Sequence, residues 1–212
     1  TFNQEKYIRE TLDSILAQSA NVPYEIIIAD DCSSDRTASI CEEYQRTFAD
    51  KIKFISNKRN QGLVVNLFDT LLSNVRGKYI ALCAGDDVWI DPRKIESQLE
   101  ILSNNDSVSV VHTRHNFYYD ASNTLYAASP WVSPLSSKKG KDAVKDVIFE
   151  NFNFFPVASS IMFRKETIDR YIVKYGGVIK DKHTVGEGLI LYCFFALDVF
   201  FECIPDIMVN YR

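Results

Sequence analysis

Three short polar clusters carry the residue types that could do chemistry in this sequence. They are "TFN" at residues 1–3, "DDCSSD" at 30–35 and "GDD" at 85–87. The second and third clusters each hold two adjacent carboxylates. Like charges this close repel, so one acid of such a pair takes up a proton unless a cation balances it. Two simpler readings stay open: residues 30–35 suit a turn before a helix, and Asp86 and Asp87 suit a solvated loop.

The elements around these clusters follow from the hydrophobic pattern. Apolar residues at helical spacing predict helices, and short apolar runs between turn residues predict strands. The first half alternates helices at 5–18, 36–48, 63–75 and 93–104 with strands at 24–30, 51–56 and 78–84. The second half is expected to contain strands at 107–120, 157–164 and 199–212, a long loop at 121–141, and helices at 142–152, from 165, and at 187–197.

This alternation predicts an α/β fold with a mostly parallel central sheet and helices on both faces. Thr1 opens on what reads as a strand-to-helix loop, so a strand is expected ahead of it. In such sheets ligands bind beyond the carboxyl ends of the strands. All three clusters lie at such ends, and a carboxylate-rich edge there favours a hard cation that bridges the phosphates of a ligand. Gly85 would let the backbone approach closely.

Composition restricts the classes of protein that need to be considered. The 212 residues are 46% hydrophobic and 25% charged, which fits one globular core. A net charge of −4 provides no basic footprint for nucleic acid, so we expect no nucleic-acid partner. The five cysteines have no metal-ligand spacing and read as core residues of a reducing compartment. No apolar run has the roughly 18–20 residues of a membrane span and no signal peptide is visible, so a soluble, cytoplasmic protein is expected.

Taken in order, the clusters and the segments between them resemble the inverting family-two glycosyltransferases of the GT-A fold, of the type that builds bacterial surface polysaccharides. The segment "TFNQEKYIRETLDSILAQ" is similar to the opening motif of that family, and "IIIADDCSSDRT" is similar to its D-D-x-S-x-D-x-T segment. The run "NKRNQGLVVNLFDTLLSNVRGKYIAL" resembles its N-x-G, helix and metal-site strand. The resemblance implies the GT-A fold, with a nucleotide-sugar-binding half at 1–107 and an acceptor-binding half at 108–212.

The resemblance also implies roles for the polar clusters. Donor-binding residues would be Thr1, Asn3, Asp30, Asp31, Arg59, Asn60, Gly62 and Asp86. Thr1 and Asp31 would contact the base or ribose of a nucleotide-sugar, most commonly a UDP-sugar, and Asp30 would support them. Asp87 would ligate Mn²⁺ or Mg²⁺ at the diphosphate, with Asp86 on the ribose or on the metal. The family often has a third acid where this sequence has Ala84, so the metal shell would depend on the donor's phosphates.

Transfer with inversion requires a general base for the acceptor hydroxyl. The resemblance implies that Glu187 in "TVGEGLILY" is this base, although a glutamate at a helix start is also favoured by the helix dipole alone. The acceptor, a glycan or a lipid-linked sugar, would meet residues 121–140, with Trp131, and 153–165, with Ser159. Peripheral association with the inner face of the membrane would use segments outside this sequence.

Two other functions compete with this interpretation. A sugar-phosphate nucleotidyltransferase should carry an N-terminal Gly-rich loop with a basic signature, which this sequence does not show. A non-catalytic homologue that only binds a nucleotide is prompted by Ala84 and by Glu187 in place of the commoner aspartate. A dehydrogenase is disfavoured because no G-x-G-x-x-G follows a strand. Turnover of a nucleotide-sugar would separate these functions.

Overall fold

The computed structural model describes residues 1–122, 124–127, 138–139, 156–179 and 199–212. Its helices are α1 (Ile8–Leu16), α2 (Thr37–Thr47), α3 (Leu63–Val65, continued by a π-helical turn Asn66–Leu71 and a 3-10 turn Leu72–Asn74), α4 (Lys94–Asn104), a 3-10 turn at Ala158–Ser160, and α6 (Lys165–Ile179). Its strands are β1 (Ile26–Asp30), β2 (Ile52–Ser56), β3 (Tyr79–Ala81), β4 (Val88–Trp89), β5 (Val108–Tyr119), β6 (Thr124–Ala127), β7 (Lys138–Lys139), β8 (Ile161–Arg164) and β9 (Phe200–Tyr211).

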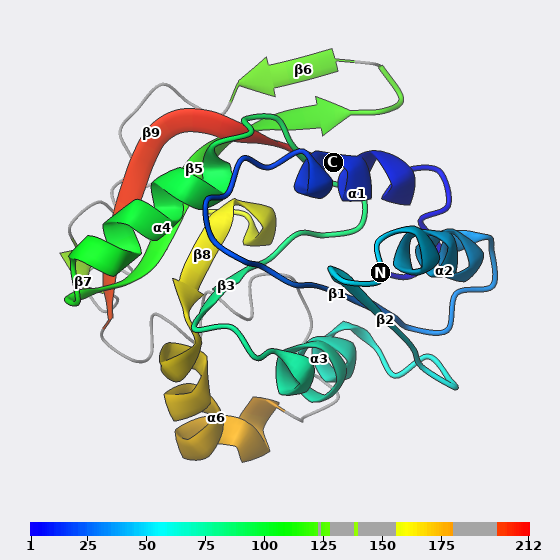
Figure 1. Cartoon of the computed structure of the whole chain (residues 1–212), viewed down its shortest axis with the longest axis horizontal. Coiled ribbons are helices and arrows are strands. Elements are labelled where there is room, and N and C mark those ends of the chain that lie inside the picture. Colours follow the sequence, from blue (N-terminus) through cyan, green and yellow to red (C-terminus); the bar gives the residue numbers. More distant parts are fainter. Residues whose placement is uncertain (123, 128–137, 140–155, 180–198) are drawn as a thin grey trace.

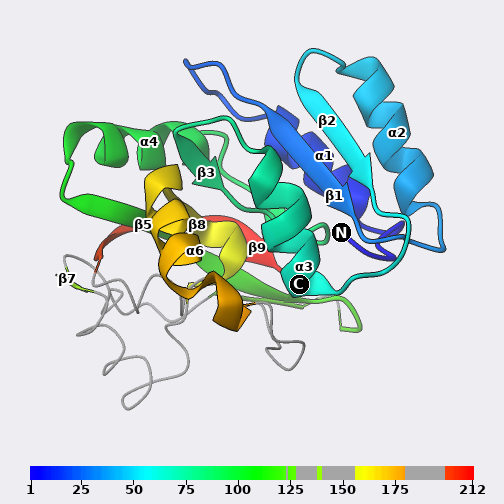
Figure 2. The same ribbon diagram turned by 90° about the horizontal axis from the view of Figure 1, so that it is seen from below.

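The described strands form two sheets, which Figures 1 and 2 show side by side. β1 and β2 pair in parallel and are flanked by α1 and α2. The larger sheet has the order β3-β8-β5-β9-β4, with β6 on β5 and β7 on β9. Its long strands β5 and β9 run in parallel and curve together along one side of the molecule (Figure 1).

Strand direction in the larger sheet corrects the expected mostly parallel arrangement. Among the described strands of this sheet, the pairs β3–β8, β8–β5, β9–β4, β5–β6 and β7–β9 are antiparallel, and only β5–β9 is parallel. The strict strand–helix alternation holds only in the first half of the chain, whereas β8 from the second half inserts between β3 and β5 in the reverse direction. The sheet is therefore mixed, while the α/β class itself is as predicted.

Helices cover both faces of the larger sheet, as expected. On one face, Ile95 and Leu102 of α4 pack against Val111 of β5. On the other face, Ile168 of α6 packs with Val110, the neighbouring residue on β5. This follows from the pleat, since successive strand side chains point to opposite faces. Phe68 and Leu72, in the turns that continue α3, join the same cluster as α6.

An apolar cavity of about 830 Å³ lies between β1 and β3, behind the polar clusters. Its walls include Leu12, Ile27, Ile80 and Leu82. Among the described strands, β1 pairs with β2 and β3 pairs with β8. No backbone hydrogen bonds of a sheet therefore join β1 to β3 across this cavity. Most of its lining residues are apolar, and such walls do not suit a nucleoside diphosphate, whose charged phosphates require polar partners. The donor site must therefore be sought among the polar residues beyond the strand ends.

In the part of the chain that the structure describes, no helix combines the length and the apolar character needed to cross a bilayer.

Candidate functional site

The carboxylate of Asp30 holds the loop that follows β1. Asp30 is fully buried, and its carboxylate accepts hydrogen bonds from the backbone N–H and the hydroxyl of Ser33. Asp35 accepts from the N–H of Thr37 at 2.9 Å at the start of α2. These contacts are those of a turn leading into a helix, so the simpler reading of residues 30–35 describes Asp30 and Asp35 well. Cys32, between them, is exposed and has a φ of +65°.

Asp31 organises the second loop of this edge. It is 3% exposed, and its carboxylate accepts the backbone N–H groups of Gln61 and Gly62 and the side-chain amide of Asn57. Gly62 has a φ of +87°, a conformation that glycine adopts without steric cost. Asp31 thus fixes the loop that presents the exposed residues 59 and 60.

The N-terminal loop joins these two loops. The Thr1 nitrogen donates to Ala29 O at 2.8 Å, and the Asp31 N–H donates to Thr1 O at 3.0 Å, so Thr1 continues the ladder of β1. Asn3, at a φ of +52°, accepts from the Ser34 N–H through its side-chain oxygen. The predicted donor residues of the first two clusters therefore lie together.

The third cluster meets the first at Gly85. A Cβ atom built on Gly85 would lie 2.7 Å from Thr1 Oγ1 and 2.2 Å from Gln4 Oε1, closer than any real contact of that kind. A side chain at this position would force Thr1 and Gln4 to shift, so glycine allows the N-terminal loop to approach this closely. The structure therefore brings all three predicted clusters to one place.

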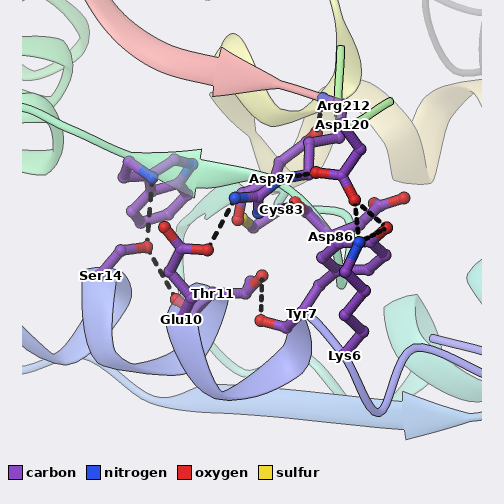
Figure 3. A network of polar contacts seen from close by, with 11 residues as sticks. Lys6, Tyr7, Glu10, Thr11, Ser14, Cys83, Asp86, Asp87, Asp120 and Arg212 are labelled. Carbon is purple, nitrogen blue, oxygen red and sulfur yellow. Dashed lines mark hydrogen bonds and ion pairs between the residues drawn. The ribbon is translucent and has the colours of Figure 1, made fainter. Parts of the chain in front are cut away.

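The two acids of the third cluster lie in different environments (Figure 3). Asp87 is 1% exposed; its Oδ1 accepts the Arg212 N–H at 2.9 Å and its Oδ2 accepts the Ser159 hydroxyl. Asp86 is half-buried, and among the described residues its carboxylate accepts no hydrogen bond, although its main-chain oxygen accepts from Arg212 Nη1 at 2.8 Å. The reading of this pair as a solvated loop is therefore wrong for Asp87.

The sequence model of the family described as "Glycosyl transferase family 2" matches residues 1–171 of this chain. The chain belongs to glycosyl transferase family 2. Among its relatives, the uncharacterized protein Rv1520 of Mycobacterium tuberculosis is 39% identical over 216 residues, covering 100% of this chain and 56% of the relative. The chain thus spans about half the length of the curated relatives that it matches along its whole length.

Solved glycosyltransferases share the fold. TarS of S. aureus, in a crystal structure with UDP, superposes with a TM-score of 0.70 at 17% identity. The superposition covers 100% of this chain and 58% of the TarS chain. Mannosyltransferase PcManGT of Pyrobaculum calidifontis, in complex with GDP-Man and Mn²⁺, gives a TM-score of 0.65 at 16% identity, with 100% of this chain and 54% of that chain covered. The GT-A fold that the resemblance implied is confirmed.

Within this family-two domain, the buried residues Trp89, Lys94 and Gln98 form a layer next to the Gly85–Asp87 turn. Trp89 follows the turn and donates from its indole N–H to Ser159 O at 3.0 Å. The Lys94 ammonium lies 4.2 Å from the centre of the Trp89 ring and donates to Gln98 Oε1 at 2.8 Å. Burial lowers the pKa of Lys94 to about 7, and it raises the pKa of the Cys83 thiol. The turn therefore rests on a desolvated layer in which charge is unfavourable.

Two residues of the candidate site were not assigned to it from the sequence. Ser159, expected at the acceptor wall, is fully buried and instead donates to Asp87 and accepts from the Ala84 N–H at 2.9 Å. Arg212 contacts both acids of the turn from the end of β9. Neither contact has a signal in the local pattern, because each joins residues more than 70 positions apart.

Several predicted residues fall outside the described residues. They include Glu187, Trp131 and most of the long loop at 121–140, together with the helices expected at 142–152 and 187–197. Part of that loop forms strand β6, which the sequence did not predict.

Proposed function

We propose that this domain transfers a sugar from a nucleotide-diphospho-sugar donor, a UDP-sugar, to a glycan or lipid-linked acceptor, with inversion and with the assistance of a divalent cation. The observation that carries the proposal is the convergence of Thr1, Asp31 and the Gly85–Asp87 turn through direct contacts. The family supplies the class of reaction. Its neighbours TarS and PcManGT were solved with UDP and with GDP-Man, which supports a nucleotide donor at this edge.

Donor recognition belongs to the loops of residues 1–107 under this proposal. Asn3, Arg59 and Asn60 are exposed on the loops that Asp30 and Asp31 hold in place, so a nucleotide can reach them. Phe2 is 45% exposed beside Thr1, and an exposed ring at this place offers a surface on which a base can stack. Asp31 then acts by holding Gly62 and its loop in the conformation that meets the nucleotide.

The residues present fit a metal that is shared with the donor. Within the described ranges no group of three or more His, Cys, Asp or Glu side chains could hold a cation. Mg²⁺ and, in similar sites, Mn²⁺ are commonly bound by one or two carboxylates together with substrate phosphates. Asp86 is the acid of the pair whose carboxylate accepts no hydrogen bond from the described residues, so we assign it the metal contact and assign Asp87 the support of the turn. When bound, the cation would stabilise the negative charge that develops on the leaving diphosphate.

The acceptor side is assigned to residues 108–212. Glu187 would remove the proton of the acceptor hydroxyl as that oxygen attacks the anomeric carbon, opposite the departing diphosphate. Residues 121–140 and 153–165 would line the acceptor. We further propose that the enzyme acts in polysaccharide biosynthesis in the cytoplasm, at the inner face of the membrane, where nucleotide-sugars are available.

A thermal-shift screen tests the donor and metal assignments together. UDP, GDP and the corresponding sugars are added with Mn²⁺, with Mg²⁺ or with EDTA. A ligand at 100 times its Kd stabilises the folded state by about 2.7 kcal/mol, which raises Tm by roughly 5–10 °C for a chain of this size. We expect such a rise with a uridine nucleotide and Mn²⁺, and a much smaller one with EDTA. No metal-dependent rise with any nucleotide would contradict the proposal.

A second measurement separates the competing functions. Transfer or hydrolysis of the nucleotide-sugar supports a glycosyltransferase, whereas binding without turnover in the full-length protein supports a non-catalytic homologue. Formation of a nucleotide-sugar from a nucleoside triphosphate and a sugar phosphate would support a nucleotidyltransferase. Cys32 provides an independent readout of occupancy, because its exposed thiol adjoins Asp31 and should be protected from maleimide by the nucleotide. The variant Cys32→Ser gives the background from the other thiols.

A further inference from the structure

Arg212, which follows β9, makes two hydrogen bonds to the turn that carries the paired acids. Its backbone N–H donates to Asp87 Oδ1 at 2.9 Å, and its Nη1 donates to the main-chain oxygen of Asp86 at 2.8 Å. Figure 3 shows this guanidinium lying over the turn, between the turn and α1. One residue therefore holds both members of the acid pair, one through its carboxylate and the other through its backbone.

The surroundings of the guanidinium fix its place. Its centre lies 5.1 Å from the ring of Tyr7 and 4.9 Å from the ring of Tyr118. Nη2 donates to Glu10 Oε2 at 2.7 Å, and Nε lies 3.6 Å from Asp120 Oδ1. The Arg212 side chain is only 14% exposed, so these charge contacts are poorly screened by water. The contacts connect the turn to α1 and to the end of β5.

Asp120 is itself held by the loop that leads into α1. Both Lys6 Nζ and Tyr7 OH donate to Asp120 Oδ2, and these bonds lower the pKa of the Asp120 carboxyl. Asp120 therefore stays ionised and keeps its charge toward Arg212. The arginine is consequently oriented from two sides, by Glu10 on α1 and by Asp120 beyond β5.

We propose that Arg212 is a positioning residue that fixes the Gly85–Asp87 turn so that the Asp86 carboxylate faces the donor. The guanidinium bonds the Asp86 carbonyl and not its carboxylate, so it orients the peptide while leaving the acid free for a cation. This inference rests on the proposed function, because it assigns Arg212 to the presentation of the metal-binding acid. Arg212 needs no contact with the sugar for this role.

Three variants separate positioning from a general contribution to stability. Arg212→Ala removes the guanidinium but keeps the backbone bond to Asp87. Arg212→Lys keeps the charge near Glu10 but loses the planar fork that reaches Asp86 at the same time. Arg9→Ala is the matched control, because Arg9 also pairs with a carboxylate, Glu43 at 2.6 Å, and lies 5.9 Å from a tyrosine ring, yet touches no part of the turn.

Two readouts are measured on each variant. The first is hydrogen exchange of the backbone amides of residues 83–89 without ligand, which reports on the turn alone. The second is the ratio of UDP affinities with Mn²⁺ and with EDTA, measured by calorimetry, which reports on the metal contact and does not depend on turnover. Loss of a residue that orients a metal ligand typically lowers metal affinity by roughly 10- to 100-fold.

We expect Arg212→Ala to speed exchange across the turn and to lower the Mn²⁺-dependent gain in UDP affinity by about 10-fold or more, at nearly constant affinity in EDTA. Arg212→Lys should recover part of that gain, and Arg9→Ala should match the wild type in both readouts. Exchange and affinity ratio in Arg212→Ala equal to those in Arg9→Ala would overturn the inference. If wild-type protein binds UDP with no gain in affinity from any metal, the proposed function fails. In that case, unchanged exchange in Arg212→Ala overturns the positioning role of Arg212 as well. Faster exchange in Arg212→Ala supports that role.

Discussion

Replacing the two adjacent acids one at a time should give opposite phenotypes. Asp87 is 1% exposed and both of its carboxylate oxygens accept hydrogen bonds, from the Arg212 N–H and the Ser159 hydroxyl. Asp86 is half-buried and its carboxylate accepts none among the described residues. We therefore expect Asp87→Asn to lower stability and Asp86→Asn to remove the metal-dependent part of donor binding.

The magnitudes follow from these contacts. A hydrogen bond to a charged group contributes about 1.5–3 kcal/mol, and an amide in place of the Asp87 carboxylate keeps only one of its two acceptor oxygens and neutralises the charge. Asp87→Asn should thus lower the free energy of unfolding by about 2–3 kcal/mol, which corresponds to a fall in Tm of roughly 4–12 °C. Asp86→Asn breaks no side-chain bond of this kind and should change stability by about 0.5 kcal/mol or less.

The assay uses the same two measurements on both variants. Thermal unfolding without ligand gives the stability, and UDP titration with Mn²⁺ and with EDTA, well below the Tm of either variant, gives the metal-dependent gain. Asp86→Asn should keep its Tm and lose the gain, while Asp87→Asn should lose Tm and keep much of the gain. The assignment would be refuted if Asp87→Asn kept the wild-type Tm and lost the metal-dependent gain in UDP affinity while Asp86→Asn kept that gain. Asp87 would then be the metal ligand.

Three further predictions test other parts of the site. Burial holds the pKa of Lys94 at about 7, below its usual 10.5, so the unfolded chain binds the extra proton between these values and stability should rise with pH there. Lys94→Met should remove that rise in stability, which amounts to about 1.4 kcal/mol per pH unit. Denaturant titrations of both proteins at pH 7.5 and 9.5 measure it, and an equal rise in wild type and variant would contradict the burial argument. Gly85→Ala should weaken UDP binding and destabilise by about 1–3 kcal/mol, because its Cβ would lie 2.7 Å from Thr1 Oγ1; unchanged Tm and affinity would show that the loops part freely. Glu187→Gln in the full-length protein should bind donor normally and lose transfer, and full transfer would exclude its role as the base.

The sequence predicted well those features that depend on local pattern. The strand expected at 24–30 is β1, and the helix expected at 93–104 is α4, with ends that differ by two residues or fewer. The convergence of the three polar clusters was also predictable, because the ends of neighbouring strands meet wherever the strands alternate with helices. Periodicity and turn residues carry this information within a few residues of each element.

Contacts between distant segments were not predictable in the same way. Strand direction in the larger sheet depends on how β8 inserts between β3 and β5, and an apolar run has the same composition in either direction. The contact between Arg212 and Asp87 joins residues 125 positions apart, and it exists because β9 runs beside β5 and ends near α1. The different burial of Asp86 and Asp87 was not predictable for a related reason, since the sequence does not show which of two adjacent side chains turns toward the core.

The unequal burial of the two acids also changes the reason for a cation at this site. Two adjacent carboxylates require compensation, and the sequence alone points to a metal as its source. In the structure part of that compensation comes from the chain itself, because Asp87 is held by two donors and Arg212 lies against the turn with its charge shared by Glu10 and Asp120. Part of the compensation for the acid pair is therefore in place without a metal, and under the proposed function we expect the need for a cation to arise when the donor adds its diphosphate beside Asp86. This is why metal and nucleotide should bind cooperatively, with weak metal affinity in the absence of the donor.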